Sequence, residues 1–417
     1  MPKSSDRQIY VWLQLASETV HIGTLWMHPY RQTQASFAYT DAWLNHSAQF
    51  ALQPALPLLQ GQTHSLAGKA TFGAIGDSAP DSWGRRLMHR AEQRRAKARG
   101  EMPRKLTEAD YLLGVNDEAR QGALRFSEAD DRVFLSPSND HNIPPLVKLG
   151  EILGATERYL ADDETYDDLK LLMQPGTSLG GARPKASVWD KDRHLAIAKF
   201  HKPDDGYNVV VWEAVALALA GEAGLEVSES RIEKIAKLEN KPVLIVRRFD
   251  RSKTGGRIPF LSAMAMVDAE DHDDDHSYSD IARVIIQHSS RANADLAEMW
   301  RRIIFNVLIC NRDDHLRNHA FLYEFHKGWR LSPLYDVNPS LEVRKPRMLE
   351  SESLASALAI AGEFRLTQPQ AKDIAAEVAR VIAKNWRRLA HRHGLSAQAI
   401  DDMAGAFVHD DATQAMK

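Results

Sequence analysis

The stretch Asn311-Arg312-Asp313-Asp314-His315-Leu316-Arg317-Asn318 places an Asp five residues before an Asn, which is the spacing of a kinase catalytic loop. In such loops the Asp, here Asp313, accepts the proton of the attacking hydroxyl group, and the Asn, here Asn318, binds magnesium on the ATP phosphates. A further carboxylate, Asp336, lies in the apolar run 331–337, which we expect to be a strand that delivers a metal ligand. The sequence therefore predicts a base, a metal-binding amide and a metal-binding carboxylate in kinase order.

Length and composition restrict the possible classes of protein. The chain has 417 residues, of which 44% are hydrophobic, so we expect two or three lobes with buried cores. A formal net charge of -3 argues against general binding of nucleic acids, so contact with DNA would need a local patch or a partner. The single cysteine, Cys310, excludes an internal disulfide and a cysteine-based zinc site. Without a signal-peptide core or a long uncharged apolar run, we expect a cytoplasmic protein that does not enter membranes.

Changes in sequence pattern divide the chain into three predicted domains. Residues 1–145 form a strand-rich N-terminal module, because short alternating apolar runs between residues 8 and 50 are typical of an antiparallel sheet. Residues 146–265 are predicted to form a kinase N-lobe with a phosphate loop, and residues 266–417 a helical C-lobe that contains the catalytic loop. The predicted fold class is α+β, with a two-lobed, protein-kinase-like core.

A basic helix is predicted from residue 81 to residue 99, after Pro80, with seven Lys and Arg residues. Two interpretations remain open. The helix could contact phosphates, or it could be a solvated face whose cations pair with nearby carboxylates, which is the usual behaviour of charge runs.

Two charged residues suggest how ATP phosphates are bound. Phosphoryl transfer depends mainly on positive charge and backbone donors around the phosphates. Lys199 lies in the strand pattern 195–200, and Glu213 lies near the start of the following predicted helix, 209–223. A lone strand lysine is usually solvent-facing, but this order is that of the lysine and glutamate that pair in protein kinases. We therefore predict that Lys199 and Glu213 belong to the ATP site.

The glycine-rich segment Gly176-Thr177-Ser178-Leu179-Gly180-Gly181-Ala182-Arg183-Pro184-Lys185 is compatible with a phosphate loop, because glycine lets backbone N–H groups converge on an anion. It is not a Walker A motif, since it lacks GKS/T and leads into a strand, and a simple tight turn is the alternative. A kinase could phosphorylate the hydroxyl groups in this segment, and the added charge would disrupt the anion site. The predicted ATP-binding residues here are Ser178, Gly180, Gly181 and Lys185.

Other histidines, carboxylates and the cysteine are expected to be structural. His315 should brace its loop by hydrogen bonding and not bind metal, since His319 follows without the glutamate of HExxH. The acidic tract 268–276 matches neither an EF-hand nor HExxH, so we expect a solvated loop. Cys310 follows an apolar helix pattern and is expected in the core.

Taken together, these motifs resemble the HipA family of bacterial serine/threonine kinases, the toxins of toxin–antitoxin pairs. The resemblance is close over residues 177–340 and includes Arg248-Phe249-Asp250-Arg251 and Ser332-Pro333-Leu334-Tyr335-Asp336. It implies specific roles: Asp313 as catalytic base, Asn318 and Asp336 as magnesium ligands, Lys199 as an ATP-phosphate contact, and Ser178 as a self-phosphorylated switch.

The resemblance also implies partners and two departures from the family pattern. It implies a small DNA-binding antitoxin (HipB-like), DNA binding only through that antitoxin, and a protein substrate such as an aminoacyl-tRNA synthetase. Arg183-Pro184 stands where some relatives have Gln-Glu, and Asp314 replaces a glycine often found after the catalytic Asp. We expect the first change to alter the mobility of the loop and the second to alter the metal site.

Two alternatives stay open. A small-molecule kinase of the aminoglycoside or choline kinase type also has an Asp with an Asn five residues later, although Ser178 and the N-terminal module favour a protein kinase. A non-catalytic, kinase-like regulator that acts through a DNA-binding partner would belong to another class. The presence of Asp313, Asn318 and Asp336 argues against it, because a regulator has no chemical need for all three.

Overall fold

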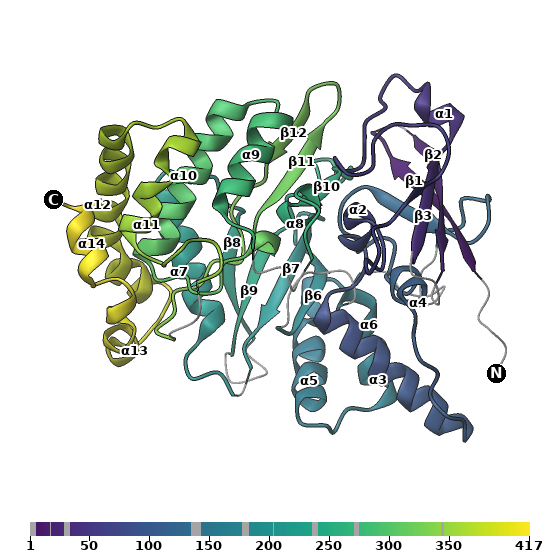
Figure 1. Cartoon of the computed structure of the whole chain (residues 1–417). Helices are drawn as coiled ribbons and strands as arrows, with labels where there is room; N and C mark the ends of the chain where they lie inside the picture. The colour runs from purple at the N-terminus through teal and green to yellow at the C-terminus, as the bar shows by residue number, and fades with distance from the viewer. Residues whose placement is uncertain are drawn as a thin grey trace. The chain divides into compact units, whose positions relative to one another are not determined.

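The chain forms two compact units whose segments alternate along the sequence. Figure 1 labels the helices and strands. The first contains residues 1–202, 235–241 and 250–261, and the second contains residues 203–234, 242–249 and 262–417. The predicted boundaries at residues 145 and 265 stay a prediction. The structure, a computed structural model, describes residues 6–16, 18–28, 34–134, 143–176, 183–202, 204–235, 241–270, 275–342 and 346–417.

The first unit begins with the antiparallel sheet that the alternating apolar pattern predicted, in the order β4-β3-β2-β1-β5. Ile9, Val11 and Leu13 of β1 are fully buried on one face of this sheet. A Cβ on Gly23 would lie 2.2 Å from Phe37 Cζ, so only glycine fits at that position. The strands are β1 (Arg7–Gln14), β2 (Thr19–Met27), β3 (Ala35–Tyr39), β4 (Thr63–His64) and β5 (Leu124–Ser127).

The predicted basic helix is α3 (Ser82–Arg99), and it has clear start and stop signals. The Asp81 carboxylate accepts a hydrogen bond from the Gly84 N–H at 2.8 Å, and Gly100 ends the helix with a φ of 67°. The acidic residues 162–164 lie between α5 and α6. The other helices of this unit are α1 (Asp41–Leu44), α2 (Gly73–Gly76), α4 (Glu108–Leu113), α5 (Leu149–Leu160) and α6 (Tyr166–Gly176).

A hairpin of β6 (Lys185–Trp189) and β7 (Leu195–Phe200) also belongs to the first unit, and β7 lies where the strand pattern 195–200 predicted it. Arg193 closes its turn with a φ of 56°. The register pairs Lys185 with Lys199, so these two lysines lie directly opposite each other.

The second unit contains α7 (Val209–Glu222), which is buried almost all round and is followed by Gly224 with a φ of 83°. Asn208 caps its start. Two neighbouring strands, β8 (Ser230–Ile235) and β9 (Lys241–Arg247), follow it. They precede the short strand β10 (Phe260–Ser262) and helix α8 (Ala263–Met266).

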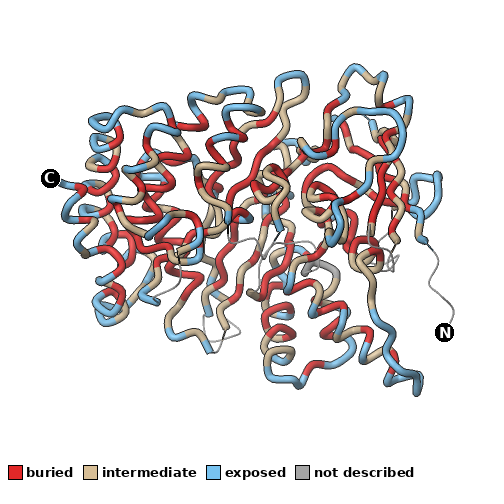
Figure 2. Tube along the Cα trace, in the orientation of Figure 1, coloured by how far each residue is buried: buried red, intermediate tan, exposed pale blue. Residues whose placement is uncertain are grey.

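The rest of the second unit is mostly helical, and the fully buried Trp300 and Ile303 of α10 lie in its core. In α12, buried and exposed residues alternate with helical spacing, as Figure 2 shows. The predicted strand 331–337 is wrong, because β12 ends at Leu331 and Pro333 has no N–H to continue a ladder. The elements are α9 (Tyr278–His288), α10 (Ala292–Leu308), β11 (Ala320–Glu324), β12 (Gly328–Leu331), α11 (Leu354–Ala359), α12 (Gln368–Arg392), α13 (Ala397–Asp402) and α14 (Asp410–Ala415).

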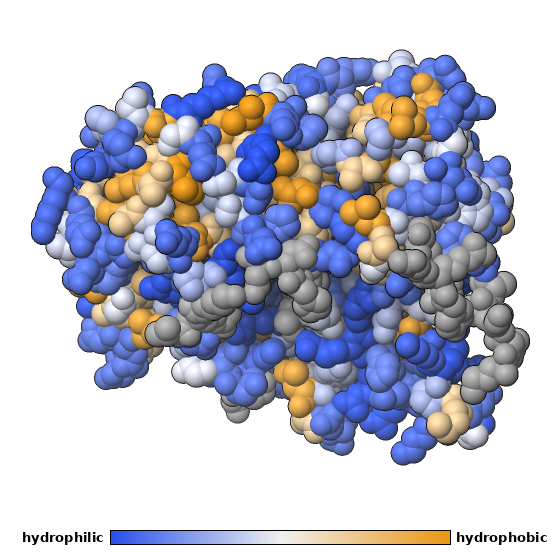
Figure 3. All heavy atoms as spheres, viewed as in Figure 1, coloured by the Kyte–Doolittle hydropathy of each residue, from blue (hydrophilic) through white to orange (hydrophobic). Residues whose placement is uncertain are grey.

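Hydrophilic residues predominate on the face drawn in Figure 3, and hydrophobic residues there gather in separate patches. None of the helices in the described part of the chain is both long enough and apolar enough to cross a membrane.

Candidate active site

Helix α10 leads directly into the loop that contains the predicted catalytic base, which we call the 311–318 loop. Cys310 turns the chain out of the helix with a φ of 51°. The Asp313 side chain is 58% exposed, and 4.0 Å separate its Oδ1 atom from Arg347 Nη1. The Asp313 carboxylate is therefore accessible to a substrate.

A single 3-10 turn at Leu316–Asn318 brings the predicted metal ligand Asn318 back to Asp313. The Asn318 Nδ2 donates a hydrogen bond to the backbone oxygen of Asp313 at 3.1 Å. The Nδ1 atom of His315 accepts a hydrogen bond from the Arg317 N–H at 3.2 Å. The predicted bracing role of His315 is thus confirmed. The hydrogen bond from Asn318 to Asp313 joins the two residues that are five positions apart in the sequence.

The segment that carries Asp336 lies against the 311–318 loop. The Tyr335 hydroxyl group donates to the Arg317 carbonyl at 2.6 Å, next to Asn318. The Ser340 N–H donates to the Cys310 carbonyl at 3.1 Å, which holds the other end of the loop. Asp336 itself has a φ of 55°, an uncommon conformation for a residue other than glycine. The role of the Asp336 carboxylate as a metal ligand stays a prediction.

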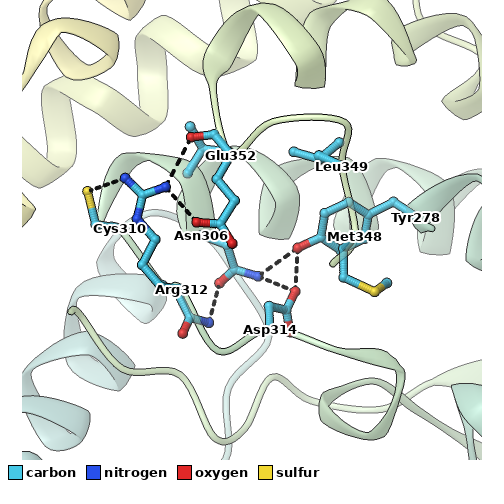
Figure 4. Close-up of a pocket in the computed structure, with 10 residues that line it drawn as sticks. Tyr278, Asn306, Cys310, Arg312, Asp314, Met348, Leu349 and Glu352 are labelled. Carbon is cyan, nitrogen blue, oxygen red and sulfur yellow. Dashed lines mark hydrogen bonds and ion pairs between the residues drawn. The ribbon is translucent and has the colours of Figure 1, made fainter. Parts of the chain in front are cut away.

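Asp314 differs from its exposed neighbour, because its side chain points into the protein (Figure 4). Its Oδ2 atom accepts hydrogen bonds from the Tyr278 hydroxyl group and from the Asn306 Nδ2 at 2.8 Å, and lies 2.9 Å from the His319 Nε2. Burial by itself raises the pKa of the Asp314 carboxyl, but His319 and Tyr278 outweigh that effect and lower it. Asp314 is therefore an ionised internal anchor of the loop, and the expected effect of this residue on the metal site stays a prediction.

The pKa of the Tyr278 hydroxyl group is shifted in the opposite direction to that of Asp314. Burial and the Asp314 carboxylate beside it raise the pKa of the Tyr278 hydroxyl well above its usual value. The hydroxyl group therefore keeps its proton and stays a hydrogen-bond donor to Asp314.

A cavity of about 20 Å³ lies behind the loop, which is room for roughly one water molecule and far too little for a nucleotide. At its edge Arg312 Nη1 lies 2.5 Å from Glu352 Oε2, and Arg312 Nη2 lies 3.6 Å from Cys310 Sγ. Burial raises the pKa of the Cys310 thiol, as expected for a core cysteine. The lining residues, most of them labelled in Figure 4, are Tyr278, Asn306, Val307, Cys310, Asn311, Arg312, Asp314, Met348, Leu349 and Glu352.

In the first unit, the β6–β7 hairpin brings two predicted ATP-binding lysines together. Lys185 and Lys199 are directly opposite in the register, so both side chains project from the same face. Like charges in this position repel each other, and an anion bound between them would relieve that repulsion. Lys185 is only 6% exposed, and its Nζ lies 3.6 Å from Asp81 Oδ2. Burial raises the pKa of Asp81 to about 6, although Lys185 works against this shift.

The remaining predicted ATP-site residues have less structural support. Glu213 is buried in α7 of the second unit, whereas Lys199 belongs to the first, so their pairing stays a prediction. The predicted phosphate-loop residues Ser178, Gly180 and Gly181, and the alternative phosphorylation site Thr177, lie outside the described residues.

At least four of the seven cations of α3 form ion pairs with carboxylates of the described residues, which favours the second interpretation of that helix. These contacts are partly exposed and come from neighbouring segments of the first unit. Arg85 forms two hydrogen bonds, of 2.7 and 2.6 Å, with Glu108. The pairs are Arg85 with Glu108, Arg90 with Asp162 and Glu164, Arg94 with Glu164, and Arg95 with Glu92 and Glu101.

The metal-binding potential of the described residues is modest. No group of three or more His, Cys, Asp and Glu side chains among them could hold a metal ion. Residues 271–274 of the acidic tract lie outside that part of the chain. Asn318 and Asp336 nevertheless fit magnesium, which usually takes one or two protein ligands and completes its shell with water and substrate phosphates.

Sequence reasoning missed four positioning residues. Tyr278, Asn306 and His319 hold Asp314, and Tyr335 joins the two predicted metal-ligand segments. The Asp doublet at 313–314 was a usable signal, because two adjacent carboxylates seldom share one environment. Nothing in the sequence pointed to Tyr278 or Asn306, which lie on α9 and α10.

Comparisons with known proteins show the family of the chain. A family model described as "HipA-like C-terminal domain" matches residues 177–410, and one described as "HipA N-terminal domain" matches residues 13–107. A protein named "Putative kinase" from Haemophilus influenzae is 28% identical over 213 residues, which are 46% of this chain and 62% of the relative. The chain thus spans about three fifths of that relative. "Putative kinase Y4mE" from Sinorhizobium fredii is 26% identical over 337 residues, 74% of this chain and 72% of the relative.

A solved structure shares the fold. The HipA of the Shewanella oneidensis MR-1 toxin–antitoxin complex with HipB and operator DNA is 16% identical and superposes with a TM-score of 0.67, over 98% of this chain and 96% of that chain. The likeness confirms the predicted α+β class. Because the match to residues 177–410 covers more than half of the 417 residues, the chain belongs to the HipA family.

Proposed function

We propose that this chain is an ATP- and magnesium-dependent kinase that phosphorylates serine or threonine residues of a protein, as the toxin of a toxin–antitoxin pair. One observation carries the proposal: the hydrogen bonds from Tyr335 and Ser340 hold the Asp336 segment against the 311–318 loop. Three side chains that phosphoryl transfer needs are thereby presented by two adjoining segments of one unit.

In this proposal each of the three side chains has one task. Asp313, being exposed, accepts the proton of the substrate hydroxyl group as the oxygen attacks the terminal phosphorus of ATP. Asn318 and Asp336 hold magnesium, which neutralises the charge that develops on the phosphate oxygens. The Asn318 amide is already oriented by its hydrogen bond to the Asp313 carbonyl, so its oxygen is free for the metal.

The β6–β7 hairpin supplies the positive charge. Lys185 and Lys199 lie opposite each other, so together they offer a site for the ATP phosphates. Ser178, Gly180 and Gly181 belong to the same proposed phosphate loop, and Ser178 or Thr177 is its proposed self-phosphorylation site. A phosphate added there would compete with ATP for these two lysines.

The proposed partners follow from the family. The Shewanella HipA was solved with HipB and operator DNA, which supports a HipB-like antitoxin for this chain. The arginines of α3 that pair with carboxylates support the view that DNA is bound only through that antitoxin. For the protein substrate we propose a translation component in the cytoplasm, such as an aminoacyl-tRNA synthetase.

Phosphate transfer in a cell extract tests this function. The purified chain is incubated with terminally labelled ATP and magnesium in extract, and labelled proteins are identified by mass spectrometry. We expect one dominant labelled protein, together with label on residue 177 or 178 of the chain itself. Asp336→Ala should lose both labels. Asp373→Ala, which changes an exposed carboxylate of α12, is the matched control and should keep them.

Two results would count against the proposal. Equal labelling by the unaltered chain and by Asp336→Ala would assign the transfer to another kinase in the extract. Labelling of a small molecule alone would favour a small-molecule kinase.

A further inference from the structure

A cavity of about 580 Å³ lies within the first unit, apart from the residues assigned to phosphoryl transfer. Its volume is within the range of small-molecule sites, roughly 300–1,000 Å³. The lining comes from β1, α3, the segment 104–114 that includes α4, and α6. Nothing in the proposed kinase function uses this cavity.

The two longer helices each present one continuous stripe to the cavity. The lining residues of α3 are Met88, Ala91, Glu92 and Arg95, and those of α6 are Tyr166, Leu169, Lys170 and Met173. Both sets have the spacing i, i+3, i+4, i+7, which places four side chains on one helix face. The two helices pack against each other, so the cavity is enclosed by secondary structure on two sides.

Most of the cavity floor is apolar and adaptable. Met88 and Met173 come from the two helices, and Leu106 and Leu113 come from the segment around α4. Methionine side chains adjust to irregular ligand shapes because they are unbranched and polarizable. This apolar part of the cavity can therefore accommodate apolar groups of different shapes.

Four cations surround this floor, against two carboxylates. Arg7 Nη1 lies 3.0 Å from Asp110 Oδ1, and Arg95 Nη2 lies 2.7 Å from Glu92 Oε1, so these arginines are neutralised. The hydrogen bonds from Arg95 hold the pKa of Glu92 at about 2, so that carboxylate is fully ionised near neutral pH.

The other two cations have weaker partners. Arg104 is 60% exposed and lies only at 3.5–3.6 Å from the same two carboxylates. Lys170 is exposed, and no ion pair with it is found among the described residues. The lining residues themselves carry two more positive than negative charges, while Glu128 and Glu101, which pair with the other two arginines, stand outside the lining.

We propose that this cavity is a binding site for a small amphipathic anion. The apolar part of the ligand packs on the methionines and leucines, and its acidic group is held by Lys170 and Arg104. Because α6 ends at Gly176, just before the proposed phosphate loop, a bound ligand would contact the helix that leads into that loop.

The test compares two fluorescent probes that share their aromatic rings and differ in charge. 1-Anilinonaphthalene-8-sulfonate is an amphipathic anion, and N-phenyl-1-naphthylamine is its neutral analogue. Each is titrated into the full-length chain in low-salt buffer. We expect the sulfonate to bind saturably at one site, with about tenfold higher affinity than the neutral probe. This ratio is what roughly one partly exposed ion pair and one weaker attraction to a more distant cation would together produce.

Three variants locate the site. Lys170→Glu should weaken binding of the sulfonate by about tenfold and leave the neutral probe nearly unchanged. Ala91→Trp fills the cavity and should abolish high-affinity binding of both probes. Lys97→Glu makes the same charge change on α3 outside the cavity, so it should leave both affinities unchanged.

The outcomes that overturn the proposal are equally specific. Equal affinities for the two probes would mean that the cations do not select an anion. Unaltered sulfonate binding in Lys170→Glu would place the probe elsewhere, and this exposed substitution keeps the test valid even if Ala91→Trp fails to fold. None of these readings depends on ATP, magnesium or a protein substrate, so loss of the proposed kinase function would leave the result interpretable.

Discussion

The 311–318 loop and helix α3 are both rich in charged residues, but the structure treats their charges differently. In the loop, Asp314 is 7% exposed and meets three side chains at one carboxylate oxygen. In α3, the arginines reach outward, and Arg85 and Arg94 remain 35% and 36% exposed in their pairs. Exposed pairs gain little, because water already solvates both ions well, whereas a buried carboxylate needs every partner it has.

This difference shows in which parts of the structure charged side chains fix the conformation of the backbone. Asp314 fixes its loop from inside and leaves Asp313 exposed, so the buried residue orders the loop and the exposed one is available for the catalytic role proposed for it. The Arg85–Glu108 pair of α3, in which both side chains are about one third exposed, can exchange with solvent at little cost. Charge density in a sequence is therefore a weak guide to function, whereas burial of a charge beside an exposed one is a stronger guide.

The largest effect should come from Asp313→Asn. Loss of a general base lowers the rate of phosphoryl transfer by about 10²- to 10⁴-fold. Because the Asp313 side chain is 58% exposed, the free energy of unfolding should change by less than about 0.5 kcal/mol. Transfer of labelled phosphate and urea unfolding measure the two quantities. Near-normal transfer would remove Asp313 from the site.

Asp314→Ala should act mainly on stability, whereas Asp313→Asn acts mainly on the rate of phosphoryl transfer. Removing a buried carboxylate leaves Tyr278, Asn306 and His319 without their shared acceptor, which costs about 3–5 kcal/mol. Urea unfolding of Asp314→Ala and of the matched control Asp313→Ala gives the comparison. A loss below about 1 kcal/mol would show that the loop is held by other contacts.

Glu92 of α3 provides a smaller, pH-dependent effect. The pKa of Glu92 is about 2 in the folded chain, against 4.5 for an ordinary glutamate, because Arg95 donates two hydrogen bonds to it. Its folded pKa is the lower one, so its stabilisation is complete above pH 4.5 and is lost as the pH falls toward 2. The unfolding free energy of the unaltered chain should approach that of Glu92→Gln over this range. A constant difference between the two would contradict the shift.

The smallest effect should come from the α3 surface. Arg85→Ala removes a partly exposed pair with Glu108 and should cost at most about 1 kcal/mol. Thermal unfolding of Arg85→Ala is compared with that of Arg99→Ala, which removes an exposed cation from the last turn of the same helix. A loss of unfolding free energy above about 2 kcal/mol would approach the loss expected for Asp314→Ala. The charged pairs of α3 and of the 311–318 loop would then contribute similarly to stability.

Much of the local structure was predictable from the sequence. The β6–β7 hairpin, the capped start of α3 and the glycine after α7 follow from patterns within a few residues. The strand predicted at 331–337 failed for a local reason as well, since Pro333 cannot donate to a ladder and the apolar residues of that run are buried in an irregular segment. Apolar content alone does not distinguish a strand from buried irregular chain.

By itself, the sequence determined the order and spacing of Asp313, Asn318 and Asp336 and the short turn that returns Asn318 to Asp313, because such turns depend on neighbouring backbone geometry. Only the tertiary structure decided that Asp314 points inward and Asp313 outward, and that Tyr335 joins the two segments. Two of the three partners of Asp314 lie on helices α9 and α10, up to 36 residues away, and the third, a histidine, belongs to the segment that follows the loop. Burial and hydrogen-bond partners arise from packing between such distant segments, and no short pattern encodes them.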